Sequence, residues 1–179
     1  MSGENDSALF ARVVMPHLAE AYALARWLTG NRADAEDVVQ EASLRAFRGI
    51  RRYAGGNARA WMLTIVRNTA LTWMAKSRPA GLIVVDDLEG IEHRQAMSGN
   101  AQDRVADPET QAIANAEAAR FEDAIAALPS PFRETLVLRD LQGLDYREIA
   151  QVTDVPIGTV MSRLARARRR LVETLTGDE

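Results

Sequence analysis

Apolar side chains recur every three or four residues along most of this 179-residue chain. Such spacing puts them on one side of an α-helix, whereas a half-buried β-strand requires strict alternation of apolar and polar residues. No convincing alternating pattern exceeds the short run Leu82–Val85. The sequence therefore predicts an all-α fold.

Turn-forming residues divide the first part of the chain into three helices. The first helical stretch, which Pro16 could interrupt, ends at Gly30, and Asn31 is placed to cap the second helix. The second helix has an apolar stripe made of Ala35, Val38, Val39, Ala42, Ala46 and Ile50. The third helix follows the turn Tyr53–Asn57. Its periodicity predicts buried side chains at Trp61, Ile65, Val66 and Trp73. The side chains expected to be exposed are Thr64, Arg67, Asn68, Leu71 and Arg78. Together these helices predict a domain over residues 1–78.

Residues 79–107 differ from the segments on either side. They lack helical periodicity, are acidic and contain glycine, so we interpret them as a flexible acidic linker. Helical patterning resumes near Pro108, which makes residues 108–179 a second helical domain.

The formal net charge of −3 hides an uneven distribution of charge. Residues 51–78 carry six basic side chains and no acidic one, whereas residues 79–128 carry three basic and ten acidic side chains. Near the C-terminus, five arginines fall within eight positions: Arg163, Arg166, Arg168, Arg169 and Arg170. Two separate basic surfaces suggest two contacts with one polyanion. Two solvated helix faces would give the same pattern, so charge alone leaves both interpretations open.

The second domain contains the pattern of a helix-turn-helix. One helix is expected to start at Ser130-Pro131 and to stop at Gly143. Asp145 and Glu148 have the spacing of a capping box, which would open a short helix that ends before the turn Thr153–Pro156. The longer helix that follows has an apolar stripe made of Ile157, Val160, Leu164, Ala167 and Leu171. A short helix, a tight turn and a half-apolar longer helix together predict the helix-turn-helix.

The free side of that longer helix has the residue types that read a DNA duplex. In this motif the second helix enters the major groove, where small polar and guanidinium side chains reach the base edges. The candidates on this side are Thr159, Ser162, Arg163, Arg166 and Arg170. The alternative is an ordinary helical hairpin with a solvated arginine-rich face.

Residues 51–78 have a composition that suits single-stranded nucleic acid. They combine possible phosphate partners with aromatic rings: Arg51, Arg52, Arg59, Arg67, Lys76 and Arg78 with Tyr53, Trp61 and Trp73. Trp61 and Trp73 lie on the apolar side of their helix, however, which favours a place in the core for both.

An acidic row, Asp34, Asp37 and Glu41, shares one side of the second helix with Leu44. The added apolar side chain favours a docking surface for a protein partner over a purely solvated face. Metal binding or catalysis would need partners that His17 and His93 do not supply at ligand spacing, and the chain has no Walker loop, serine elbow or HExxH motif. We therefore expect no enzyme activity, metal or other cofactor.

The chain also lacks the features of exported or membrane proteins. It has no cysteine, its N-terminus lacks the pattern of a secretion signal, and its apolar runs are too short to span a bilayer. We expect a soluble, cytoplasmic protein without membrane insertion.

Several segments, in this order and at this spacing, resemble the extracytoplasmic-function (ECF) sigma factors of bacterial RNA polymerase. These segments are Asp34–Phe47, Trp61–Thr69, Leu128–Glu134, Tyr146–Ala150 and Gly158–Leu164. The resemblance implies an N-terminal domain that opens and reads the minus-ten promoter element. It also implies a C-terminal domain that reads the minus-thirty-five element.

The resemblance also implies contacts for particular residues. Those expected to bind core RNA polymerase, at the clamp coiled coil and at the flap of the other large subunit, are Asp34, Asp37, Gln40, Glu41, Leu44, Phe132 and Leu136. Those expected to bind minus-ten DNA, with one flipped base held by the loop after Arg52, are Arg51, Arg52, Tyr53, Asn57, Arg59, Arg67 and Asn68. Those expected to bind minus-thirty-five DNA are Thr159, Met161, Ser162, Arg163, Arg166 and Arg170.

The chain departs from the family pattern at a few of these positions. Met161 stands where many relatives carry a basic residue, and Ala165 is small where others are larger. The loop Gly55–Asn57 is shorter than the common Arg-Gly-Asp-Ser version. The family's promoter sequence therefore does not carry over to this chain. Family members are usually held inactive by an anti-sigma protein, and we expect one here.

Two other kinds of protein remain as alternatives. One is a helix-turn-helix regulator that binds palindromic duplex DNA as a dimer without polymerase. The other is a helical enzyme or metal protein, for which Asp34, Asp37 and Glu41 would be tested first. Stable association with core polymerase separates the sigma interpretation from both.

Overall fold

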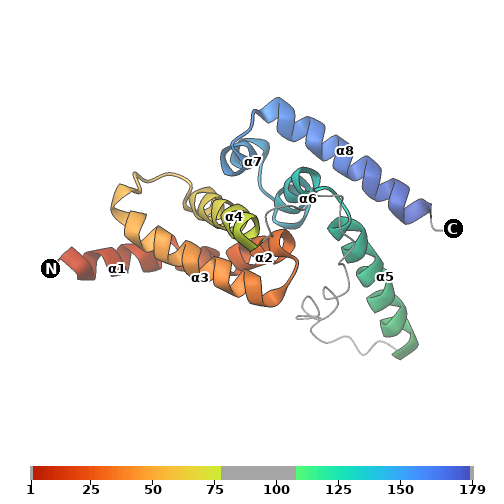
Figure 1. The fold of residues 1–179 in the computed structure, drawn as a ribbon, viewed down its shortest axis with the longest axis horizontal. Coiled ribbons are helices and arrows are strands. Elements are labelled where there is room, and N and C mark those ends of the chain that lie inside the picture. Colours follow the sequence, from red (N-terminus) through yellow and green to blue (C-terminus); the bar gives the residue numbers. More distant parts are fainter. Residues whose placement is uncertain (1, 78–107, 178–179) are drawn as a thin grey trace.

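The computed structural model describes residues 2–77 and 108–177, and every regular element within these ranges is helical (Figure 1). The predicted all-α fold, with its C-terminal helix-turn-helix, is therefore confirmed. Arg78 and the predicted linker 79–107, which includes Leu82–Val85, lie outside the described residues.

The N-terminal domain contains four α-helices and two 3-10 turns. Their bounds are α1 Ser2–Val13, η1 Met15–His17, α2 Leu18–Thr29, α3 Arg32–Gly49, η2 Ile50–Arg52 and α4 Ala58–Ser77. Pro16 interrupts the first helical stretch as predicted, and Gly30 ends α2 in a left-handed conformation with φ +83°. Asn31 caps α3, because its side-chain oxygen accepts a hydrogen bond of 2.8 Å from the backbone N–H of Asp34.

Helices α2, α3 and α4 pack against one another and form the core of this domain. The predicted stripe of α3 is buried except at Val39, which is half-buried. Of the four core residues predicted in α4, Val66 is fully buried. The other three, Trp61, Ile65 and Trp73, are half-buried. The residues of α4 that are buried instead are Ala60, Met62, Leu63, Thr69 and Ala70.

The prediction for α4 was wrong in part because this helix has neighbours on more than one side. It packs on α2 and α3, and it also packs on a helix of the C-terminal domain. Thr64, Arg67 and Leu71 are therefore half-buried, and among the five residues expected to be exposed only Asn68 is exposed within the described part of the helix.

The C-terminal domain is built from α5 Pro108–Ala126, α6 Ser130–Leu136, the π-helical turn η4 Val137–Leu141, α7 Tyr146–Thr153 and α8 Ile157–Thr176. The predicted capping box is present: Asp145 Oδ1 accepts from the N–H groups of Arg147 and Glu148, both at 2.8 Å, and Glu148 Oε2 accepts from the Asp145 N–H at 2.7 Å. Gly143 before it and Asp154 after α7 both have positive φ, which allows the chain to turn sharply at each end.

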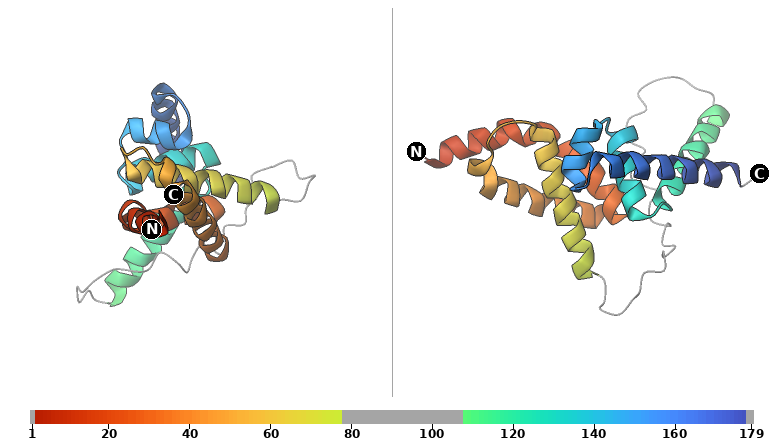
Figure 2. Two further views of the ribbon diagram at one scale, coloured as in Figure 1. Left: turned by 90° about the vertical axis from the view of Figure 1, so that its left-hand side faces the viewer. Right: turned by 90° about the horizontal axis from the view of Figure 1, so that it is seen from above.

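Burial along α7 and α8 follows the predicted pattern at most positions. Ile149, Val160 and Leu164 are buried, as are Ala167 and Leu171. Ile157 is 41% exposed instead, because it is the first residue of α8 and no earlier turn of the helix lies beside it. Most of α5 is exposed too, and Figure 2 shows this helix projecting away from the other elements.

The two domains are packed together, an arrangement that the sequence did not predict. Helix α4 lies against α7, and α2 lies against α6 (Figures 1 and 2). The C-terminal domain therefore covers one side of the N-terminal domain.

The capping box gives a direct test of how α7 is held. Replacement of Asp145 by Ala removes the acceptor of two backbone N–H groups, so we expect the free energy of unfolding to fall by about 1 kcal/mol. Urea denaturation followed by circular dichroism measures this change. Asp145→Ser keeps a capping oxygen and should stay close to the original stability, and equal stability of the Ala and Ser variants would contradict the assignment of the cap.

Candidate nucleic-acid interface

The N-terminal part of α8 presents an exposed surface suited to a DNA groove. Helix α7, with its capping box, and the turn at Asp154 fix where α8 begins. Met161, Ser162 and Arg166 are exposed on α8. The Ser162 hydroxyl donates to the carbonyl oxygen of Thr159 at 3.0 Å, which leaves its oxygen able to accept a hydrogen bond from a base.

Two of the other predicted duplex-binding residues of α8, Arg163 and Arg170, interact with residues of α6. Thr159 and Arg163 are half-buried. Burial raises the pKa of the Glu134 carboxyl of α6, and the charge of Arg163 offsets part of that rise. The Arg170 guanidinium stacks over the ring of Phe132, 5.2 Å from its centroid. The predicted set therefore divides into an exposed group and a group in contact with the rest of the domain.

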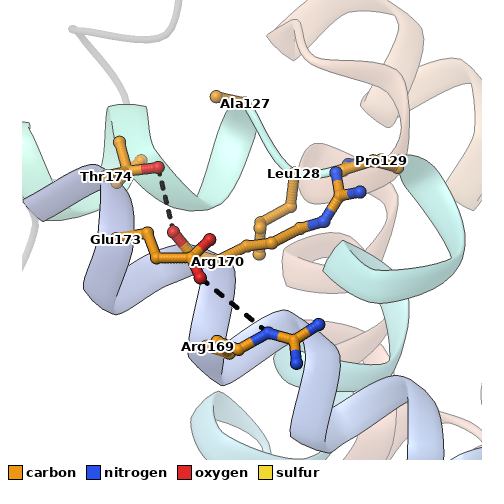
Figure 3. Close-up of a pocket in the computed structure, with 8 residues that line it drawn as sticks. Ala127, Leu128, Pro129, Arg169, Arg170, Glu173 and Thr174 are labelled. Carbon is orange, nitrogen blue, oxygen red and sulfur yellow. Dashed lines mark hydrogen bonds and ion pairs between the residues drawn. The ribbon is translucent and has the colours of Figure 1, made fainter.

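The remaining arginines of the cluster also make contacts within the domain. Arg168 binds Asp140 of η4 through two hydrogen bonds, Nε–Oδ2 at 3.1 Å and Nη2–Oδ1 at 2.6 Å. The Nε atom of Arg169 lies 3.9 Å from Glu173 Oε1 (Figure 3). These five arginines thus do not form one uniform basic surface.

A shallow pocket of about 660 Å³ lies where the end of α5 meets the second half of α8 (Figure 3). Its lining residues are Ala124, Ala127, Leu128, Pro129, Arg169, Arg170, Glu173 and Thr174. The pocket lies along the second half of α8 and begins one helical turn after Arg166.

The predicted base-holding loop is held by its own aromatic residue. The Tyr53 hydroxyl donates to the carbonyl oxygen of Gly56 at 2.7 Å, and its ring centroid lies 5.0 Å from that of Trp61. Gly55 and Gly56 have φ +88° and +96°, a conformation that other residues rarely adopt. Arg52 is exposed on one side of this loop, and Asn68 is exposed on α4.

Three predicted minus-ten residues donate hydrogen bonds to the C-terminal domain. Asn57 Nδ2 donates to Glu148 Oε1, and Arg59 Nη2 donates to the carbonyl oxygen of Gln142. Arg67 Nε donates to Glu134 Oε1 at 3.0 Å. Carboxylate and carbonyl oxygens of the protein thus occupy donors that DNA would require.

Two further contacts engage the same surface. Arg59 Nε donates to Glu20 Oε2 of α2, and Gln142 Nε2 donates to the Glu20 carbonyl oxygen at 2.9 Å. On the opposite side, Arg51 Nε donates to Asp6 Oδ2 of α1 at 2.7 Å.

Two charged residues of the helices that meet between the domains are buried. Glu134 is 2% exposed, and this burial raises the pKa of its carboxyl, while the charge and hydrogen bond of Arg67 and the charge of Arg163 partly offset the rise. Arg26 of α2 is 5% exposed, and its Nε and Nη1 atoms have no hydrogen-bond acceptor among the described residues. Since desolvation of charges opposes close packing, we infer that this contact is less stable than the cores that it joins.

The acidic and apolar row on α3 is accessible in part. Asp37 and Gln40 are exposed, and Leu44 is 48% exposed. Asp34 accepts from Asn31 Nδ2 at 2.7 Å, and Glu41 accepts from Arg45 Nε at 2.8 Å, so these two carboxylates already have partners.

Phe47 extends the predicted docking surface on α3, whereas the two predicted polymerase-binding residues of α6 are covered in part or fully. Phe47 is 42% exposed, with its ring centroid 5.4 Å from that of Phe10, and its position one turn after Leu44 could have indicated it. Leu136, predicted to meet polymerase, is 2% exposed, because the end of α6 faces the core of the C-terminal domain. Phe132 is half-buried beneath Arg170.

Across residues 2–77 and 108–177, no helix combines the length and apolar character needed to cross a membrane. In the same part of the chain, acidic and histidine side chains do not gather in a group of three that could hold a metal ion.

Comparison with known proteins identifies both helical domains. Residues 13–79 match the model of sigma-70 region 2, and residues 118–171 match the model of sigma-70 region 4. The ECF RNA polymerase sigma-E factor of Escherichia coli (strain K12) is 35% identical over 141 residues, which cover 77% of this chain and 72% of that protein. The ECF RNA polymerase sigma factor SigE of Mycolicibacterium smegmatis is 34% identical over 164 residues, which cover 91% of this chain and 60% of that protein.

A solved structure has the same arrangement of elements. The sigma factor RpoE of Bartonella quintana, crystallised with the anti-sigma factor NepR, superposes with a TM-score of 0.70 at 27% identity over 95% of this chain and 98% of that one. The chain therefore belongs to the ECF sigma factor family of RNA polymerase, whose members are transcription initiation factors. The resemblance first found in the sequence motifs is confirmed.

The raised pKa of Glu134 makes the stability of the fold depend on pH. A carboxyl whose pKa is raised in the folded protein contributes stability fully below its ordinary pKa, and this contribution is lost as the pH rises through the raised value. We expect the contribution of Glu134 to the free energy of unfolding to fall as the pH rises through this window. Urea denaturation followed by circular dichroism at a series of pH values measures this.

The control is Glu134→Gln, which resembles the protonated carboxyl and should remove this pH dependence. Glu36→Gln changes an exposed carboxyl on α3 and should leave it intact. Equal pH dependence in the original protein and the Glu134→Gln variant would contradict the prediction.

Proposed function

We propose that this chain directs core RNA polymerase to promoters as an ECF sigma factor. The N-terminal domain would open and read the minus-ten element, and the C-terminal domain would read the minus-thirty-five element. The observation that carries the proposal is the exposed start of α8, with Ser162 and Arg166, on a capped helix-turn-helix in a chain of this family.

Minus-thirty-five recognition would use the exposed group on α8. Arg166 can donate two hydrogen bonds to a guanine edge, and Ser162 can accept from an amino group in the major groove. Arg163 and Thr159 would reach the DNA backbone beside the α6 side of the helix. Because few phosphate contacts release few counterions, the chain alone would bind promoter DNA weakly.

Minus-ten recognition would use the loop at Tyr53 and the exposed side of α4. Extrusion of one base from the duplex costs a few kcal/mol, and a pocket at the loop would offset that cost. Asn57, Arg59 and Arg67 would contribute only after they leave their acceptors in the C-terminal domain. Promoter opening would therefore require the two domains to separate.

Docking on polymerase would use Asp37, Gln40 and Leu44 on α3, with the clamp coiled coil as the partner. Polymerase would fix the spacing of the two domains and supply the remaining DNA contacts, so that two weak contacts act together.

An anti-sigma protein that holds the domains packed would block this assembly. The similar RpoE structure, which contains the anti-sigma factor NepR, supports this form of control. The place of action would be the cytoplasm, and no cofactor would be needed.

The docking surface can be tested by a double substitution. Asp37→Ala together with Leu44→Ala removes one charge and one apolar contact from an exposed row, so we expect affinity for core polymerase to fall by at least about tenfold. Transcription in vitro from a promoter library should fall with it. Glu36→Ala, on the same helix but outside the row, is the matched control. A double variant that assembles and transcribes normally would refute the docking surface, and dimeric DNA binding without polymerase would refute the sigma function.

The recognition helix can be tested by single arginine substitutions. Arg166→Ala should weaken binding of the holoenzyme to minus-thirty-five duplex DNA by about 1–3 kcal/mol if it makes a good base contact, and Arg163→Ala should weaken it within the same range. Competition binding measures both. Arg168→Ala is the control variant, because the Arg168 side chain is already bound to Asp140 in the original chain. Unchanged affinity for both the Arg163 and Arg166 variants would remove the assignment of α8 as the recognition helix.

A further inference from the structure

Two large apolar side chains are exposed at the start of α8. Ile157 is 41% exposed and Met161, one turn later, is 52% exposed. A single exposed apolar residue on a protein surface is ordinary. This pair, however, lies at the end of the helix that the proposed function places in the major groove.

The residues around Met161 are small. Gly158 lies one turn before it, Ala165 one turn after it, and Ser162 beside it. A Cβ atom placed on Gly158 would meet no other atom within 4 Å, so the surface there is open. A partner could therefore approach the backbone of α8 closely, and Met161 would be the longest apolar group to reach it.

The charges on the exposed half of α8 favour DNA as that partner. Arg166 is exposed, and the side chain of Arg169 is 69% exposed. An apolar protein surface would have to desolvate these guanidinium groups, whereas a DNA duplex offers phosphates to both.

The major groove contains one apolar group, the 5-methyl of thymine. Methionine is unbranched and has three rotatable bonds, so it adapts to the position of such a group. Arg166 and Ser162 offer hydrogen bonds, which suit guanine and amino groups and do not detect a methyl. We propose that Met161, with its apolar surface extended by Ile157, reads the 5-methyl group of a thymine in the minus-thirty-five element. This proposal rests on the proposed sigma function.

The experiment removes the methyl group and changes nothing else. The full chain with core RNA polymerase first selects its minus-thirty-five sequence from duplex DNA randomised in that region. Each thymine of the selected duplex is then replaced, one at a time, by deoxyuridine. We expect one replacement to reduce holoenzyme affinity by about fourfold, the effect of one buried methyl group.

Variants of the chain assign that effect to Met161. Met161→Ala should bind the thymine and uracil duplexes equally, and Met161→Leu should still prefer thymine. Val172→Ala is the control, because Val172 is 58% exposed on α8 but lies roughly 16 Å further along the helix axis. Its preference for thymine should be unchanged.

Each other outcome overturns the proposal. If a sequence is selected but no thymine responds to loss of its methyl group, or if Met161→Ala responds as the original chain does, the inference fails and the sigma function stands. If Met161→Ala lowers polymerase binding in the absence of DNA, and no replacement of thymine by deoxyuridine changes the affinity, Met161 contacts polymerase and does not contact DNA. If no sequence is selected and no transcript forms, the sigma function fails and the inference fails with it.

Discussion

The packing of α4 is the constraint on which the rest of this structure depends. Apolar side chains occur on every side of this helix, including Met62, Leu63 and Val66, which are buried, and Trp61 and Ile65, which are half-buried. A helix of this kind must be covered on more than one side. Helices α2 and α3 cover part of it, and α7 covers another part. The two domains are brought together for this reason.

That packing decides which polar groups meet between the domains. Asn57, Arg59 and Arg67 lie in or next to α4 and find acceptors on the C-terminal domain. Glu134 is almost fully buried, which raises the pKa of its carboxyl, and Arg26 is buried with two nitrogens for which the described residues offer no acceptor. Apolar coverage therefore stabilises the contact, while the desolvation of the buried charges opposes it.

Separate parts of α8 serve different purposes within one helix. Val160, Leu164 and Ala167 hold the helix on its domain, and Arg163 and Arg170 face α6. The exposed side then combines Met161, Ser162 and Arg166. The exposed side therefore offers both hydrogen-bonding groups and an apolar side chain.

The sequence by itself determined the helices and their ends. Gly30, Asn31 and the pair Asp145–Glu148 satisfy backbone groups within a few residues of themselves, so their effect does not depend on distant parts of the chain. The motif segments likewise determined the family, and the periodicity of α3 determined its buried stripe. Only the tertiary structure decided which sides of α4 are buried, that Leu136 is in the core, and that Arg67 is paired with Glu134. Periodicity shows that a helix has an apolar side, but the number of neighbours around that helix is set by contacts between residues far apart in the chain.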